Sequence, residues 1–288
     1  MSMDWALHRH AWPNAAHSRF VEVRPHRWHV QIAGQGPVCL LLHGAGAATH
    51  SWRDLLPRLA HDFTVIAPDL PGHGFSRLGT PFRASLPHMA ADLWQLLEHL
   101  EHPPDLIVGH SAGAALGLQM ALTGPISAVI GLNAALAPFD GAAAILFPVL
   151  ARSLALNPLT PGLTARTLAG PRRIERLISG TGSRLDPTGL ALYQRVASDP
   201  QHIRGVLEMM SRWTPATVSH RLNHITPPVH LLTATNDRTV SPAVSRKAAS
   251  KLPHGRLDTL GPLGHLAHEE DPEATAERIS RIYAETLS

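Results

Sequence analysis

Residues 105–113 read Asp-Leu-Ile-Val-Gly-His-Ser-Ala-Gly, and this stretch decides the fold. The apolar run 106–108 predicts a buried strand, and the alanine-rich run 114–122 predicts a helix directly after it. Glycines at positions 109 and 113 allow the sharp reversal between the two, which leaves the hydroxyl of Ser111 standing above the end of the strand. Ser111 is therefore the candidate nucleophile.

Whether residues 109–113 form a nucleophile elbow depends on the elements on either side of them. A Gly-x-Ser-x-Gly match on its own also occurs in ordinary loops, because its residue types are common. Here the match lies between a predicted strand and a predicted helix, which is the context that a nucleophile elbow requires. Two further residues of the expected types follow in the expected order, as described below.

Composition limits the class of protein. The chain has 288 residues, of which 44% are hydrophobic and 16% charged, so we expect a globular protein built as one enlarged α/β domain. The net charge is +3, and the basic residues are scattered without a basic run. We therefore expect no nucleic-acid partner.

The sequence predicts neither a disulfide nor a membrane-spanning segment. Cys39 is the single cysteine, so no intramolecular disulfide can form, and its apolar neighbours predict a buried core residue. Residues 1–10 lack an apolar signal segment, and no stretch of eighteen apolar residues follows. We expect a cytoplasmic protein without a transmembrane segment, with peripheral membrane contact left open.

Predicted strands and helices alternate along the chain, which favours a mostly parallel central sheet with helices on both faces. Residues 19–23 and 28–32 alternate like an edge hairpin, whereas the later strands are continuous apolar runs, as in a sheet buried on both faces. The expected strands after the hairpin are 38–42, 64–67, 105–108, 127–132, 229–233 and 256–260. The expected helices are 52–59, 86–100, 114–122 and those that open at Pro242 and Pro272.

One long segment breaks the alternation. Residues 134–226 contain helical pieces separated by prolines, and they predict an inserted helical cap. The expected organisation is a first core part at 1–133, the cap at 134–226 and a second core part at 227–288. Apolar cap residues are expected either to pack together or to form the substrate wall; the candidates for the wall are Phe147, Met209, Met210 and Trp213.

A serine hydroxyl needs a base within hydrogen-bonding reach and a carboxylate that orients the base. Asp237 directly follows the predicted strand 229–233, and His265 directly precedes the last predicted helix. This chain order of serine, acid and histidine is that of hydrolases with a nucleophile elbow. The alternatives are that Asp237 is an ordinary turn residue and that His268 is the base.

Backbone N–H groups must stabilise the negative oxygen that forms when serine attacks a carbonyl group. We expect this oxyanion hole to use Ala112, at the start of a helix, and Ala45, in the glycine-rich turn after the early strand. His43 and His110 flank these positions and are expected to contact substrate. The alternative for residues 43–46 is a plain turn after a strand.

Metal or cofactor chemistry is not expected. His99, Glu101 and His102 have a spacing that a metal ion could use, as do His265 and His268. Neither group is accompanied by convincing third and fourth ligands. We therefore expect no metal site and no cofactor.

With these residues in place, the chain resembles the α/β-hydrolases, and more closely the magnesium chelatase accessory proteins of bacteriochlorophyll biosynthesis. The resemblance spans almost the whole chain. One departure is Ala234, where a glycine is more usual at the start of the acid loop. The segments that carry the resemblance are 12–14, 18–21, 43–54, 67–75, 108–114, 156–158, 181–183, 209–210 and 264–270.

The resemblance implies a role near magnesium insertion into protoporphyrin, with magnesium chelatase subunits as partners. A small apolar substrate, an ester or a tetrapyrrole, would suit the cap. Carboxylates of a tetrapyrrole would then meet cap arginines; the candidates are Arg152, Arg166, Arg172 and Arg173. Three readings stay open: a serine esterase in this pathway, a non-catalytic tetrapyrrole-binding module, and a generic carboxylic ester hydrolase.

Overall fold

The structure is a computed structural model, and it describes residues 2–137, 157 and 159–287. The central element is an eight-stranded sheet in the order β1-β2-β4-β3-β5-β6-β7-β8. The hairpin β1/β2 is antiparallel, β2 also runs antiparallel to β4, and all other neighbours are parallel. The strands are β1 (Ser18–Val23), β2 (His26–Ala33), β3 (Val38–Leu42), β4 (Thr64–Pro68), β5 (Leu106–His110), β6 (Ala128–Leu132), β7 (Val229–Thr233) and β8 (Gly255–Thr259).

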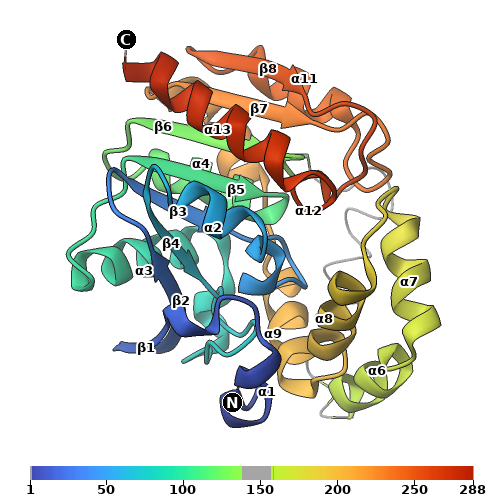
Figure 1. The fold of residues 1–288 in the computed structure, drawn as a ribbon. Helices are drawn as coiled ribbons and strands as arrows, with labels where there is room; N and C mark the ends of the chain where they lie inside the picture. Colours follow the sequence, from blue (N-terminus) through green and yellow to red (C-terminus); the bar gives the residue numbers. More distant parts are fainter. Residues whose placement is uncertain (1, 138–156, 158, 288) are drawn as a thin grey trace.

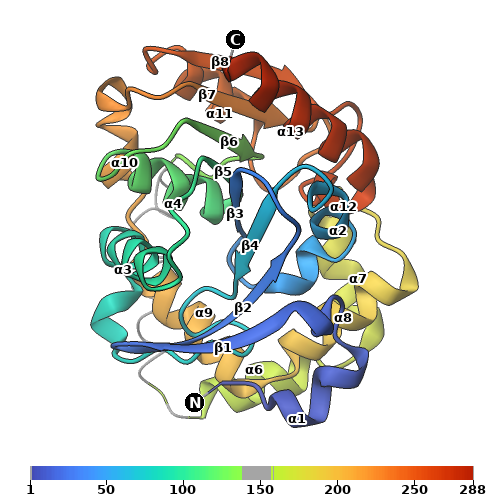
Figure 2. The ribbon, with the colours of Figure 1, turned by 60° about the vertical axis from the view of Figure 1, so that its left-hand side comes forward.

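Helices cover both faces of the sheet, as the apolar strands require (Figures 1 and 2). One face packs against α3 (Leu86–His99), α4 (Ala112–Ala121) and α11 (Pro242–Ala249). The other packs against α2 (Leu55–Leu59) and α13 (Pro272–Leu287). Alternate residues of β3 serve the two cores, since Leu40 belongs to the first and Leu41 to the second.

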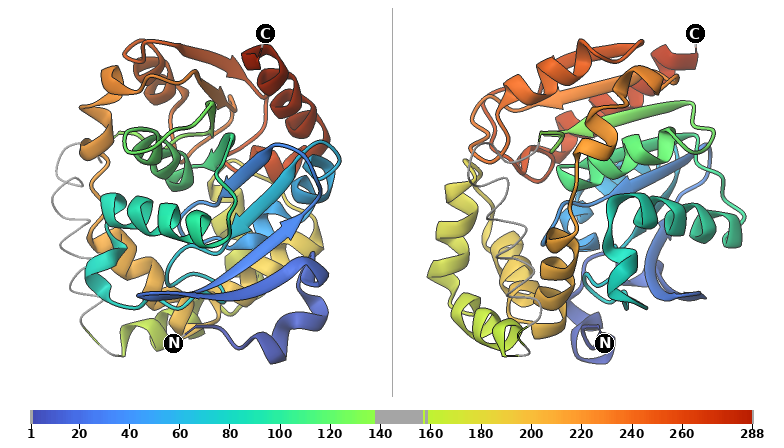
Figure 3. Two further views of the ribbon diagram at one scale, coloured as in Figure 1. Left: turned by 90° about the vertical axis from the view of Figure 1, so that its left-hand side faces the viewer. Right: turned by 180° about the vertical axis from the view of Figure 1, so that it is seen from behind.

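Four further helices lie together beside the carboxyl ends of the strands (Figures 1 and 3). They are α6 (Thr160–Leu168), α7 (Pro171–Gly180), α8 (Pro187–Ala197) and α9 (Pro200–Ser211). We call these four helices and their connections the cap. The following α10 (Ala216–Ser219) packs against α4, and Leu222 and Ile225 belong to the core. The expected boundary of the cap at Thr226 stays a prediction.

Short helices complete the described chain. Three are α1 (Trp5–His8), at the N-terminus, and η3 (Thr49–Trp52) and α12 (Ala267–Glu270), near the carboxyl end of the sheet. The others, which like η3 are 3-10 helices, are η1 (Arg9–Ala11), η2 (Ala15–His17), η4 (Pro81–Ala84) and η5 (Leu222–His224).

Candidate active site

The turn between β5 and α4 holds Ser111 in a strained conformation. Its φ of 52° and ψ of −113° are rare for a residue with a side chain. A Cβ on Gly113 would lie 2.0 Å from the carbonyl oxygen of Leu42, and one on Gly109 would lie 2.4 Å from that of Gly113. Glycine is therefore required at both positions, and the turn raises Ser111 above the sheet edge.

The side chains of Asp237 and His265 meet beside this turn. Asp237 lies in the loop after β7, and its Oδ2 is 2.7 Å from Nδ1 of His265. Its other oxygen, Oδ1, accepts hydrogen bonds from the backbone N–H groups of Thr239 and Val240 at 2.7 and 2.9 Å. The carboxylate is thus fixed at both oxygens, which orients the imidazole ring with Nε2 left for other partners.

Two buried side chains hold the backbone of His265. Nε2 of His110 donates to the carbonyl oxygen of His265 at 2.9 Å, and Nδ2 of Asn133 donates to the same oxygen at 2.9 Å. Asn133 also accepts from the N–H of Ala234, at the start of the acid loop, at 2.8 Å. Burial, reinforced by nearby His268 and His265, lowers the pKa of His110 well below its ordinary value, so His110 is a neutral donor.

The cap contributes to the same platform through a strap formed by residues 181–184. The carbonyl oxygen of Thr181 accepts from the N–H of Arg238 at 3.1 Å and from that of His265 at 3.3 Å. Oγ of Ser183 accepts from the N–H of Leu266 at 2.8 Å. Gly182 has a φ of +89°, and a Cβ there would lie 2.0 Å from the carbonyl oxygen of Asn236. The strap therefore joins the acid loop to the histidine loop.

A second connection between cap and core surrounds the buried carboxyl of Glu269. The hydroxyl of Tyr193, on α8, donates to its Oε1 at 2.6 Å, and Arg53 donates to its Oε2 at 3.2 Å. Arg53 also binds Oδ1 of Asp186, the N-cap residue of α8, at 2.9 Å. Burial raises the pKa of Glu269 to about 8 despite the nearby Arg53.

The candidate oxyanion hole lies between the turn 43–46 and the start of α4. Ala112 is the first residue of α4, so its N–H has no partner within the helix. Ala45 is exposed on the cavity opposite. His202, on cap helix α9, fixes the loop that carries Ala45: its Nε2 donates to the carbonyl oxygen of Gly46 at 3.1 Å, and its Nδ1 accepts from the N–H of Gly74 at 3.0 Å.

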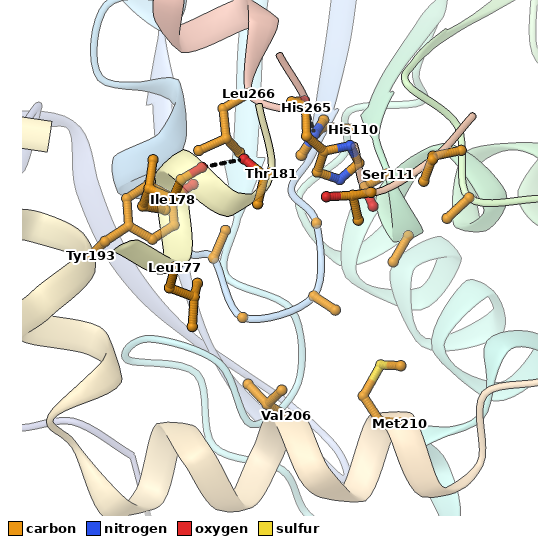
Figure 4. A pocket seen from close by; sticks show the side chains of 18 of the residues that line it. His110, Ser111, Leu177, Ile178, Thr181, Tyr193, Val206, Met210, His265 and Leu266 are labelled. Carbon is orange, nitrogen blue, oxygen red and sulfur yellow. Dashed lines mark hydrogen bonds between the residues drawn. The ribbon is translucent and has the colours of Figure 1, made fainter. Parts of the chain in front are cut away.

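Ser111, His265, Ala45 and Ala112 all line one cavity of about 690 Å³ between the sheet edge and the cap. Figure 4 shows the imidazoles of His110 and His265 beside Ser111, with Val206 and Met210 across the cavity on α9. Apolar side chains form most of the cap side; they come from α7 (Ile174, Leu177, Ile178) and α9 (Ile203, Val206, Met210).

The expected substrate-contacting residues divide into three groups. His110, Met210 and Trp213 line the cavity. Phe147 lies outside the described residues.

The remaining two, His43 and Met209, are not on the cavity wall. Met209 is fully buried in the core. His43 is also buried, with Nδ1 donating to the carbonyl oxygen of Gly44 and Nε2 accepting from the N–H of Leu70, at 2.8 and 2.9 Å. These hydrogen bonds hold His43 within the turn, away from the cavity wall.

The arginines expected to meet ligand carboxylates do not line the cavity where the structure describes them. Arg166, Arg172 and Arg173 are exposed on the outer side of the cap, and none of them lines the cavity. Arg152 lies outside the described residues. The arginines face outward because Pro161, Ala165, Ile174 and Ile178 form the buried faces of α6 and α7.

Sequence reasoning gave no role to Asn133, Tyr193 or His202, which hold the loops of the site. Their contacts join segments far apart in the chain, so no local pattern marks them. The one available signal was the segment 181–183 together with 264–270, since both carried the family resemblance and the structure places them in contact.

In the part of the chain that the structure describes, no helix combines the length and apolar character needed to cross a membrane. Within the same residues, no three histidine, cysteine, aspartate or glutamate side chains are grouped closely enough to hold a metal ion.

Known proteins share both the sequence and the architecture. The family model "alpha/beta hydrolase fold" matches residues 37–272. The magnesium-chelatase 30 kDa subunit of Rhodobacter capsulatus is 43% identical over 260 residues, covering 90% of this chain and 91% of that protein. The uncharacterized hydrolase YugF of Bacillus subtilis is 26% identical over 88% of this chain and 91% of its own.

Among solved structures, an alpha/beta hydrolase fold protein from Burkholderia ambifaria superposes with a TM-score of 0.76 at 20% identity, over 91% of this chain and 96% of that one. This likeness supports the fold. Together with the match of the family model and the 43% identical relative, it leads to one conclusion: the chain belongs to the α/β-hydrolase fold family.

Proposed function

We propose that the protein is a serine hydrolase in which Ser111 is the nucleophile, His265 the general base and Asp237 the residue that orients the base. The observation that carries this proposal is the 2.7 Å contact between Asp237 and His265 beside a serine whose strained turn points it into the same cavity. This arrangement has the parts that activation of a serine hydroxyl requires.

The reaction follows from these positions. Oγ of Ser111 attacks the carbonyl carbon of an ester while Nε2 of His265 takes the hydroxyl proton. The N–H groups of Ala112 and Ala45 donate to the carbonyl oxygen as it becomes negative. The C–O bond to the alcohol breaks, and His265 gives its proton to the departing oxygen. Water then attacks the acyl-serine with His265 again as base, which releases the acid and restores Ser111.

A fluorophosphonate probe tests the nucleophile directly. We expect the parent protein to be labelled and Ser111→Ala to be unlabelled. Alanine keeps the Cβ and therefore the backbone strain, so the fold should persist. We expect His265→Gln to react roughly 10²- to 10⁴-fold more slowly, and Ser127→Ala, at an exposed serine, to react like the parent. A parent protein that is folded yet unlabelled would contradict the proposal.

We further propose that the reaction serves bacteriochlorophyll biosynthesis beside the magnesium chelatase step, with chelatase subunits as candidate partners. The support is the 43% identity, over nine-tenths of both chains, to a protein named as a magnesium-chelatase subunit. The pigment profile of a host carrying Ser111→Ala tests it. We expect less bacteriochlorophyll and accumulated protoporphyrin, whereas unchanged pigment with normal expression would refute a role for the serine there.

The same relative favours a second candidate, a non-catalytic module that binds a tetrapyrrole for the chelatase. The large apolar cavity is compatible with the apolar ring of such a ligand. The two candidates differ in outcome, because the module predicts porphyrin binding at micromolar concentration in both the parent and Ser111→Ala, and no labelling by the probe.

A further inference from the structure

The cavity beside Ser111 has a one-sided chemical character. Among its described lining residues there is no aspartate, glutamate, lysine or arginine, although the chain has 25 basic and 22 acidic residues. Arg53, which shares Glu269 with the wall residue Tyr193, is itself paired with three carboxyl groups, those of Asp54, Asp186 and Glu269. An anionic group of a ligand would therefore find no cation among the described residues of the wall.

The polar side chains of the wall are mostly occupied. The hydroxyl of Tyr193 donates to Glu269, and that of Thr181 donates to the carbonyl oxygen of Ile178. Both ring nitrogens of His202 are bound to backbone groups, and burial lowers its pKa to about 4, so it stays neutral. Thr239 and Ser241, in the loop after Asp237, also line the wall, so the groups available to a ligand are concentrated around Ser111, the candidate oxyanion hole and this loop.

The far side of the cavity is formed mostly by apolar side chains. Figure 4 shows Leu177 and Ile178 on α7, and Val206 and Met210 on α9, on the cap side of the cavity from Ser111. A ligand group that reaches from Ser111 toward the cap must therefore leave water for an apolar wall. This transfer is favourable for hydrocarbon and costly for an unpaired charge.

From this arrangement we infer a substrate class: the cavity accepts esters whose cap-facing part is uncharged and apolar, and it rejects esters that carry a carboxylate there. The inference rests on the proposed function in one respect, because it takes the substrate to be an ester. The exclusion of charge concerns binding alone and can be tested without turnover.

A pair of ligands that differ in one terminal group provides the test. Dimethyl suberate and monomethyl suberate share an eight-carbon chain and one methyl ester, but the second carries a carboxylate at its far end at pH 7.5. Calorimetric titration of Ser111→Ala measures their dissociation constants without hydrolysis. We expect the monoester to bind at least a hundredfold more weakly, well beyond the twofold statistical factor. Equal affinities, or no binding of the diester, would overturn the inference.

A matched pair of variants locates the effect. In a Ser111→Ala background, Met210→Lys introduces a cation on the wall, and Leu207→Lys introduces one on the same helix at a position that does not line the cavity. We expect Met210→Lys to reduce the ratio of the dissociation constants of the monoester and the diester at least tenfold. We expect Leu207→Lys to leave this ratio unchanged. An unchanged ratio in both variants would show that discrimination arises elsewhere and refute the assignment to this wall.

The result of this ligand titration can be told apart from the result of the fluorophosphonate labelling. Labelling of Ser111 combined with equal binding of both esters would refute the substrate class and leave the proposed function standing. Absent labelling combined with the expected discrimination would refute the hydrolase and retain an apolar, charge-excluding site.

Discussion

Glu269 offers a quantitative test of how the cap is attached to the core. Its carboxyl is buried between Tyr193 of the cap and Arg53 of the core, and burial raises its pKa to about 8 from an ordinary value of 4.5. We predict that Glu269→Gln, which keeps the shape of the side chain but removes its ionisable group, makes stability less sensitive to pH.

The direction in which stability changes with pH follows from proton linkage. Below pH 4.5 the carboxyl is protonated in the folded and the unfolded chain, so its contribution to stability is fully present. Between pH 4.5 and about 8 the unfolded chain has released the proton that the folded protein keeps, and each pH unit favours unfolding about tenfold. The accumulated loss is about 5 kcal/mol over this window, and above it the loss levels off.

Urea unfolding of the parent and of Glu269→Gln from pH 5 to 9 measures this difference. We expect the difference in unfolding free energy to shift in favour of the glutamine variant up to about pH 8 and then to remain constant. Because all other titrating groups are shared, they cancel in the comparison. A difference that is independent of pH would show that the charge of Arg53 outweighs burial and would refute the reasoning.

Two further predictions concern the loops of the site. Gly182→Ala should lower the unfolding free energy by about 2 kcal/mol or more, since the φ of Gly182 is positive and a Cβ there would meet a backbone carbonyl. Gly180→Ala, with open space around the new Cβ, should be neutral or slightly stabilising. Thermal unfolding of both variants tests this, and similar melting temperatures would count against the tight fit of the strap. Asp237→Asn should reduce kcat for ester hydrolysis roughly 10⁴-fold by favouring the wrong tautomer of His265, and an unchanged kcat would exclude Asp237 as the orienting residue.

The fold was predictable because its signals are local. Continuous apolar runs marked the parallel strands, and the glycines around Ser111 marked the turn whose φ the structure gives as 52°. Chain order then selected Asp237 and His265, which the structure places 2.7 Å apart between Oδ2 and Nδ1. His268, the alternative base, is fully buried beside Trp52, and burial lowers its pKa to about 3.

Which apolar cap residues line the cavity was less predictable, because the sequence of a helix does not show which neighbour each apolar residue faces. Met209 and Met210 are adjacent in the sequence, but a helix turns about 100° per residue, so the first enters the core and the second lines the cavity. Arg166, Arg172 and Arg173 had the right chemistry for carboxylates but lie on exposed helix faces. Only the tertiary arrangement could separate these cases.

The strap 181–184 has a consequence for evolution and engineering. A cap inserted into a hydrolase core is often imagined as an exchangeable module, but here its backbone hydrogen-bonds to the loops of both Asp237 and His265. New specificities can therefore arise through the cavity faces of α7 and α9, whereas transplanting a whole foreign cap would require residues 236–238 and 264–270 to be replaced with it. The cap and the loops that carry Asp237 and His265 are therefore joined into one structural unit.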